Sequence, residues 1–158
     1  MDSRKKELLQ ELAKNFEETK KDLGFKSAFS ELDEAFFITD AVLSADFVSE
    51  RFSRQICGRI VDTYMNWNHY LNNLLMPNPA YMVSSTESRL FNTEEWKKKI
   101  WELIKGSMKI ATTNYLIGLN KDKKMESKLI DEAFEYWTAQ FKPALIEITG
   151  KINHEWKK

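Results

Sequence analysis

Residues 47–76 read FVSERFSRQICGRIVDTYMNWNHYLNNLLM, and this stretch decides the fold class. Its large apolar side chains recur every three or four residues, which is the repeat of one face of an α-helix. They are Phe52, Ile56, Ile60, Tyr64, Trp67, Leu71 and Leu74. The spacing predicts one long amphipathic helix. Pro77 and Pro79 follow it, and a proline disfavours helical geometry in the residue before it, so the helix ends there.

Helical spacing continues toward the N-terminus. It predicts a first helix over residues 2–23, closed by Gly24 in a left-handed cap. A second helix is predicted to open at Ser30, because Ser30 and Asp33 have the spacing of a capping box. The sequence leaves open whether residues 44–46 break this second helix.

Toward the C-terminus, the sequence predicts an irregular loop up to residue 91 and then a fourth helix that starts at Asn92. A turn over residues 120–124 leads into the last helix, which Pro143 is expected to kink or split. The side chains of the fourth helix expected to face the core are Trp96, Ile100, Leu103, Ile104, Met108, Ala111 and Tyr115.

Together these segments predict an all-α fold, an antiparallel bundle of five or six helices that forms a single domain over residues 1–158. No window alternates apolar and polar residues for long enough to predict a strand. The chain is 42% hydrophobic and its charges balance, with 24 Lys and Arg against 24 Asp and Glu. This composition is typical of a folded protein, and it excludes a global field that attracts nucleic acid.

The compartment is predicted from three features. Cys57 is the only cysteine, so no disulfide within the chain and no cysteine-based zinc site can form, which suits a reducing compartment. No secretory signal is expected at the N-terminus, and no apolar run approaches the roughly 20 residues that span a bilayer. The sequence therefore predicts a cytoplasmic protein without a membrane segment.

The polar face of the helix over residues 47–76 is the most informative surface. It is rich in residues that make directed hydrogen bonds rather than in Lys and Glu, and Gly58 beside it leaves room for a close approach. One interpretation is a site that contacts a protein partner, an anion or a nucleotide; the other is a polar seam in which Arg59 and Asp62 form an ion pair. On the first interpretation, Arg59→Ala weakens partner binding more than thermal stability. The predicted contact residues are Arg51, Arg54, Gln55, Arg59, Asp62, Asn66 and His69.

No stretch of the sequence carries a catalytic signature. The two histidines, His69 and His154, lack a second ligand at helical spacing. Cys57 lies on the apolar side of its helix and is predicted to be a core residue. There is no glycine-rich phosphate loop and no nucleophile motif. The sequence thus predicts no catalytic residue, no metal and no cofactor, and favours a non-enzymatic role.

A basic edge on the fourth helix offers a second candidate surface. It could neutralise phosphates in a salt-dependent way, although the neighbouring tryptophans are expected to face the core and so give no stacking platform. Its possible nucleic-acid contacts are Lys97, Lys98, Lys105 and Lys109.

Three functions are compatible with these residues. The first is a helical interaction or assembly protein that binds a protein partner or forms a homo-oligomer. The second is an accessory subunit associated with nucleic acid. The third is a binder of small molecules, whose pocket, closed by the loop at residues 77–91, would be lined by Tyr64, Trp67, Tyr115 and Trp137.

Overall fold

The computed structural model describes residues 2–158, which form eight α-helices, one π-helical segment and no strand. This confirms the all-α class, and it gives more helices than the five or six expected. In chain order the elements are α1 (Ser3–Leu23), α2 (Phe29–Phe36), α3 (Ile38–Ala45), α4 (Phe52–Leu75), α5 (Met82–Arg89), α6 (Glu94–Asn120), α7 (Lys123–Tyr136), the π segment η1 (Trp137–Phe141) and α8 (Lys142–Trp156). Within residues 2–158, no helix has both the length and the apolar character needed to cross a membrane.

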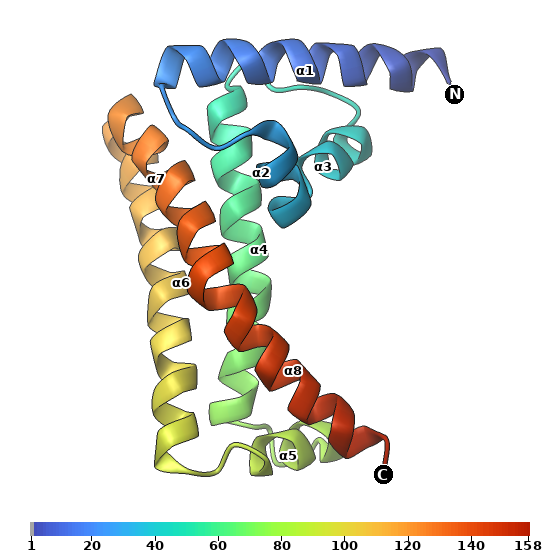
Figure 1. Cartoon of the computed structure of the whole chain (residues 1–158), viewed down its shortest axis with the longest axis vertical. Helices are drawn as coiled ribbons and strands as arrows, with labels where there is room; N and C mark the ends of the chain where they lie inside the picture. The colour runs from blue at the N-terminus through green and yellow to red at the C-terminus, as the bar shows by residue number, and fades with distance from the viewer. Residues whose placement is uncertain (1) are drawn as a thin grey trace.

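Three long rods make up most of the molecule, and each runs antiparallel to the next one along the chain (Figure 1). They are α4, α6 and the rod formed by α7, η1 and α8, and α4 contacts α6 more extensively than any other pair of elements does. Figure 1 shows α1 lying across one end of these rods, with α2 and α3 beneath it and α5 at the opposite end. The structure is therefore a three-rod bundle closed at one end by a transverse helix.

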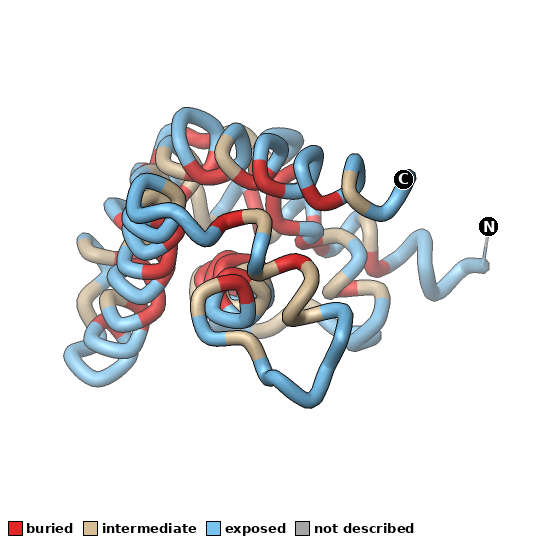
Figure 2. Tube along the Cα trace, turned by 90° about the horizontal axis from the view of Figure 1, so that it is seen from below, coloured by how far each residue is buried: buried red, intermediate tan, exposed pale blue. Residues whose placement is uncertain are grey.

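The core is aromatic where the rods meet. The ring centroid of Tyr64 lies 4.8 Å from that of Phe141 and 5.6 Å from that of Trp137, and Phe36 approaches Trp137 to 5.8 Å. Figure 2 shows the buried residues on the sides of the helices that face one another. These rings come from α2, α4 and η1, so one cluster joins three parts of the chain.

The first predicted helix is confirmed as α1. The carboxylate of Asp2 accepts the backbone N–H of Arg4 at its start, and Gly24 ends it in the left-handed conformation with φ of 80°. The long helix is confirmed too, although α4 starts at Phe52 rather than at residue 47. It ends at Leu75, two residues before Pro77.

The second helix breaks earlier than the sequence indicated. Phe37 adopts the left-handed conformation, with φ of 55°, and separates α2 from α3. The carboxylate of Asp33 then accepts the N–H of Thr39 at 2.6 Å and its hydroxyl at 2.9 Å. The expected capping box at Ser30 was wrong, because α2 already begins at Phe29 and Asp33 serves the start of α3 instead.

The expected loop at residues 77–91 was also wrong, because it contains α5. Glu87 on α5 is buried and accepts hydrogen bonds from the Tyr70 hydroxyl at 2.6 Å and from Nε1 of Trp156 at 2.8 Å. The hydroxyl of Ser88 donates to the Leu74 carbonyl at 2.6 Å. Polar bonds to α4 and α8, rather than an apolar face, hold this short helix in place.

The remaining boundaries need small corrections. The N-cap of α6 is Thr93, whose hydroxyl oxygen accepts the N–H of Trp96 at 3.2 Å, rather than Asn92. The effect of Pro143 is confirmed, since a π-helical segment separates α7 from α8 just before it. A proline cannot donate the helical hydrogen bond, so the ladder changes register there.

Candidate interaction surfaces

The polar face of α4 divides into two parts. Near the start of the helix, the side-chain oxygen of Gln55 accepts the N–H of Ser49 at 3.0 Å. One turn later, Nε of Arg59 donates to the carbonyl of Phe36 at 3.1 Å, at the break between α2 and α3. These two residues bond within the chain, as the polar-seam interpretation expects.

The second part of the face lies on the surface. Asp62, Asn66 and His69 are exposed, and Nη1 of Arg59 lies 3.8 Å from a carboxylate oxygen of Asp62. The space beside Gly58 is open, since a Cβ built there would have no neighbouring atom within 4 Å. The chain itself makes no use of the close approach that Gly58 permits. A contact role for the exposed residues stays a prediction.

The three arginines do not form one cluster. Arg54 points toward α6, where Nη2 donates to the carbonyl of Asn114 at 3.2 Å. Arg51 is exposed at the N-cap of α4 and lines the same cleft as Arg54. Arg59 bonds to the α2–α3 junction instead. The three arginines therefore do not form a single anion site.

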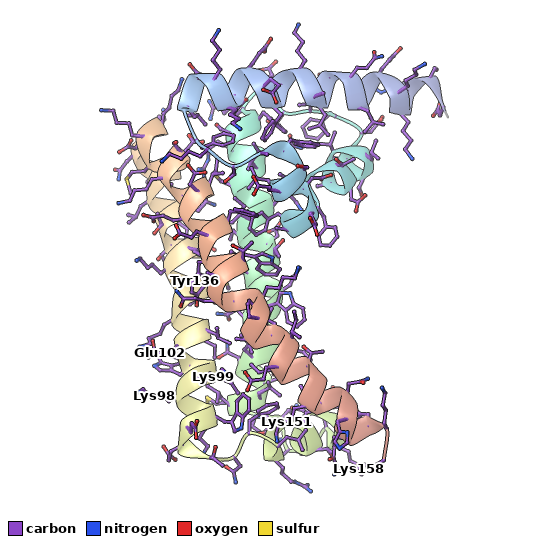
Figure 3. All side chains as sticks on the ribbon, in the orientation of Figure 1. Lys98, Lys99, Glu102, Tyr136, Lys151 and Lys158 are labelled. Atoms are coloured by element: carbon purple, nitrogen blue, oxygen red, sulfur yellow. The ribbon has the colours of Figure 1, made fainter. Side chains whose placement is uncertain are left out.

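The basic edge of α6 is partly neutralised by its own helix. Lys105 pairs with Glu102 at 2.7 Å and Lys97 lies 4.0 Å from Glu94. In Figure 3, Lys98 and Glu102 lie on the outer side of α6. Lys98 and Lys109 are exposed and have no ion pair among residues 2–158. The four predicted contacts thus lie on one helix, and acids accompany two of them.

The outer face of α6 carries a surface that was not predicted from the sequence. Trp101, Met108 and Tyr115, all expected to be buried, are exposed. They recur every seven residues, and Lys105, Thr112 and Leu119 lie four residues after each of them. These six positions follow the alternating three- and four-residue steps of a coiled-coil seam. We call them the α6 seam.

The seam becomes fully uncharged toward its end. Residues 110–120 contain no charged side chain over eleven positions, in a chain that is 30% charged. The large hydrophobic side chains on this side of α6 are between 39% and 79% exposed, namely Trp101, Met108, Tyr115, Leu116 and Leu119. Gatherings of exposed apolar side chains on one face mark interaction sites more often than isolated ones do. The sequence signal for this surface is the absence of charge over residues 110–120, although Met108 and Tyr115 were expected to face the core.

The four aromatic residues expected to line a common pocket do not do so. Tyr64 is fully buried and donates its hydroxyl to the Ala133 carbonyl at 2.6 Å. Trp137 packs against it, whereas Tyr115 lies on the outer face of α6. The expected pocket was therefore wrong, because two of its members fill the core and one faces solvent.

Cys57 is confirmed as a core residue, with no exposed surface. Burial chiefly, and the charge of Glu126 in addition, raise the pKa of its thiol to about 12, against the opposing charge of Arg54. The thiolate is the reactive form of cysteine, so this side chain is unreactive at neutral pH. No group of three or more His, Cys, Asp or Glu side chains that could hold a metal ion occurs within residues 2–158.

Comparison with known proteins adds no relative: no protein-family model, no curated protein and no solved structure matches this chain.

Proposed function

We propose that this chain is a non-enzymatic assembly protein of the cytoplasm, which pairs with a second copy of itself through the α6 seam. The observation that carries the proposal is the row of exposed large side chains on one face of a 27-residue helix. Burial of such apolar surface in an interface stabilises the complex by about 25 cal/mol for each Å² removed from water. Residues 110–120 carry no charge, so covering this part of the face does not incur the free-energy cost of removing charged groups from water.

The seam matches itself in an antiparallel arrangement. A two-fold axis beside residue 110 places each seam residue opposite a different seam residue of the second copy. Such pairing is what a self-complementary interface requires. The facing pairs are Trp101 with Leu119, Lys105 with Tyr115, and Met108 with Thr112. The second of these pairs sets an ammonium group against an aromatic ring, which is a favourable contact.

The size of the seam sets the expected strength of the dimer. A stable interface covers about 800 Å² on each partner, more than one helix face of five large side chains supplies. Flanking side chains such as Glu102 and Lys109 add area at the rim of the dimer interface. We expect a reversible dimer whose population depends on concentration.

The basic edge supports a second candidate, a contact with nucleic acid. Trp101 is exposed between Lys98 and Lys105, so a stacking group does accompany the lysines, contrary to the expectation that the tryptophans face inward. Lys105 is already paired with Glu102, and the C-terminal half of the seam has no charge that would attract phosphate. Self-assembly uses the whole seam, and so it is the function we favour.

The test is sedimentation velocity over a wide range of protein concentrations, combined with the absorbance ratio at 260 and 280 nm. We expect a monomer–dimer equilibrium without nucleic acid. Leu119→Glu places a charge in the uncharged half and should leave a monomer of unchanged thermal stability. Ile146→Glu is the matched control, because Ile146 is 63% exposed on α8, away from the seam.

Cross-linking tests the antiparallel register. Met108→Cys and Thr112→Cys are prepared separately, with Cys57 buried in both and thus protected. Under mild oxidation the mixture of the two variants should give a covalent dimer that neither gives alone. A wild-type protein that stays monomeric at every concentration contradicts the proposal. Nucleic acid that is retained at low salt and released at high salt favours the second candidate instead.

A further inference from the structure

A cleft of about 350 Å³ lies where four helix ends meet beneath α1. The last turns of α1 and α6 and the first turns of α4 and α7 line it. In Figure 1 these ends gather under the C-terminal half of α1, at the opposite end of the molecule from α5. The volume is at the lower end of the range for sites that hold small molecules. We call this the Glu126 cleft.

Two charged groups that line the cleft, Glu126 and Arg54, each have one buried atom without a hydrogen-bond partner among residues 2–158. Glu126 is only 5% exposed, and its Oε2 has no hydrogen-bond partner within residues 2–158. Arg54 uses Nη2 to bond the Asn114 carbonyl, while its buried Nη1 makes no hydrogen bond. Glu126 and Arg54 do not form an ion pair with each other, although both act on the pKa of Cys57 and so lie near it. Buried charged groups without partners are costly, so each of them needs an explanation, of which a bound ion or ligand is one.

Basic side chains slightly outnumber acidic ones around the cleft, because Arg51, Arg54, Lys121 and Lys123 line it together with Asp22, Glu50 and Glu126. Arg51 is the N-cap of α4, and no side chain accepts the first-turn N–H groups of that helix. Lys121 and Lys123 also line the cleft, and Lys123 pairs with Asp22 at 3.7 Å. Unpaired N–H groups and the helix dipole together attract negative charge to such a position. The inner carboxylate, in contrast, needs a hydrogen-bond donor.

We propose that the Glu126 cleft binds a small zwitterion with the chemistry of a free α-amino acid. Its ammonium group donates to the carboxylate of Glu126. Its carboxylate accepts from Nη1 of Arg54 and from the first turn of α4. Gly118 keeps the wall open beside Arg54, since a Cβ built there would lie 3.3 Å from Nη2 of Arg54. One ligand thereby satisfies both unpaired groups of the inner wall.

The first experiment is a thermal-shift and calorimetric titration of the full chain with the twenty amino acids. Acetate, methylamine and inorganic phosphate are titrated in parallel as probes with one charge type only. We expect at least one amino acid to bind, and each single-charge probe to bind at least about tenfold more weakly, because it lacks one charge-assisted hydrogen bond. Equal binding of phosphate or acetate overturns the zwitterion assignment.

Variants then locate the site. Glu126→Gln should weaken the binding at least about tenfold, as should Arg54→Met. Glu135→Gln, an exposed carboxylate on the same helix, is the matched control and should bind as the wild type does. Leu119→Glu should also bind normally, so that loss of the dimer and loss of the ligand are separate outcomes.

The protein without ligand supplies an independent readout. A buried carboxylate without a partner opposes folding, so Glu126→Gln should unfold at a higher temperature than the wild type. If Glu126→Gln instead unfolds at a lower temperature, and no amino acid shifts the wild type, then Glu126 is a structural residue satisfied by ordered water. That result overturns the proposal.

Discussion

Tyr136 packs its ring directly on the α6 backbone at Gly106, where a Cβ would stand 2.6 Å from Cζ of the tyrosine. The same ring stacks on Tyr64, with centroids 6.1 Å apart and planes inclined by 20°. Burial raises the pKa of the Tyr136 hydroxyl, and the charge of Glu102 raises it further. Figure 3 shows Tyr136 where α7 passes α6. The two helices approach this closely only because residue 106 has no side chain.

Gly106→Ala is therefore expected to destabilise the protein. Alanine favours a helix over glycine by about 1 kcal/mol, but overpacking against Tyr136 costs about 1–3 kcal/mol. The net change is a loss, measurable as a lower urea midpoint. Gly150→Ala is the control, because no atom lies within 4 Å of a Cβ at that helical position. It should gain up to about 1 kcal/mol; an equal gain for Gly106→Ala would show that Tyr136 moves away without cost.

Arg59→Ala is expected to act on folding rather than on assembly. Its Nε–H bond holds the Phe36 carbonyl at the strained junction between α2 and α3, so its loss should lower stability by about 1–2 kcal/mol. This reverses the sequence-based expectation of an effect on partner binding. The Arg59–Asp62 pair is a surface contact, and Asp62→Ala should change stability by less than about 1 kcal/mol. A weaker dimer in sedimentation for Arg59→Ala would restore the earlier expectation.

The sequence predicted those parts of the fold that local chemistry determines. The apolar repeat of α4, the glycine that ends α1 and the proline after η1 are each read from a few neighbouring residues. The polar contacts between distant segments were not predicted from the sequence. The carboxylate of Asp131 on α7 accepts the backbone N–H groups of Lys26 and Ser27 at 2.9 and 3.0 Å. Lys26 lies 105 residues from Asp131 in the sequence, so no local spacing of residues predicts this hydrogen bond.

The candidate surfaces were harder to predict for a related reason. Met108 and Tyr115 were expected to face the core but are exposed, because nothing in one sequence says which side of a helix faces a neighbour. Tyr115 and Ile117 are both apolar and two residues apart, but only Ile117 faces the core. The Glu126 cleft joins four helix ends, and Glu126 itself reads in sequence as one more acid on a polar face. Such features depend on packing between distant segments.

Glu87→Ala is expected to release the helix at residues 82–89. The carboxylate accepts two hydrogen bonds, from Tyr70 on α4 and Trp156 on α8, and each bond to a charged group contributes about 1.5–3 kcal/mol. We expect a loss of about 3–6 kcal/mol, together with faster proteolysis between residues 77 and 91. Glu18→Ala is the control, because Glu18 is exposed on α1. If the two variants have the same stability, the bonds to Glu87 do not hold α5.

Stability is expected to fall steeply above pH 9. The Cys57 thiol keeps its proton in the folded protein up to a pKa of about 12, because it is desolvated and lies near Glu126, whereas its ordinary pKa is 9.0. Between these values the unfolded chain has lost the proton and the folded chain has not. Unfolding is therefore favoured as the pH rises, by up to about 1.4 kcal/mol per pH unit. Below pH 9 both states hold the proton, and the contribution to stability is constant.

Three tyrosines whose pKa is raised, Tyr64, Tyr70 and Tyr136, steepen this loss above pH 10. The pKa values of Tyr64 and Tyr70 are raised first by burial, and for Tyr70 also by its hydrogen bond to Glu87. Urea midpoints at pH 7, 9, 10 and 11 measure the slope. Cys57→Ala should be less stable at every pH, because it leaves a cavity, but should lose little stability between pH 9 and 10. If its slope there equals that of the wild type, the thiol titrates normally in the folded protein, and the interior around Glu126 and Arg54 is open to water.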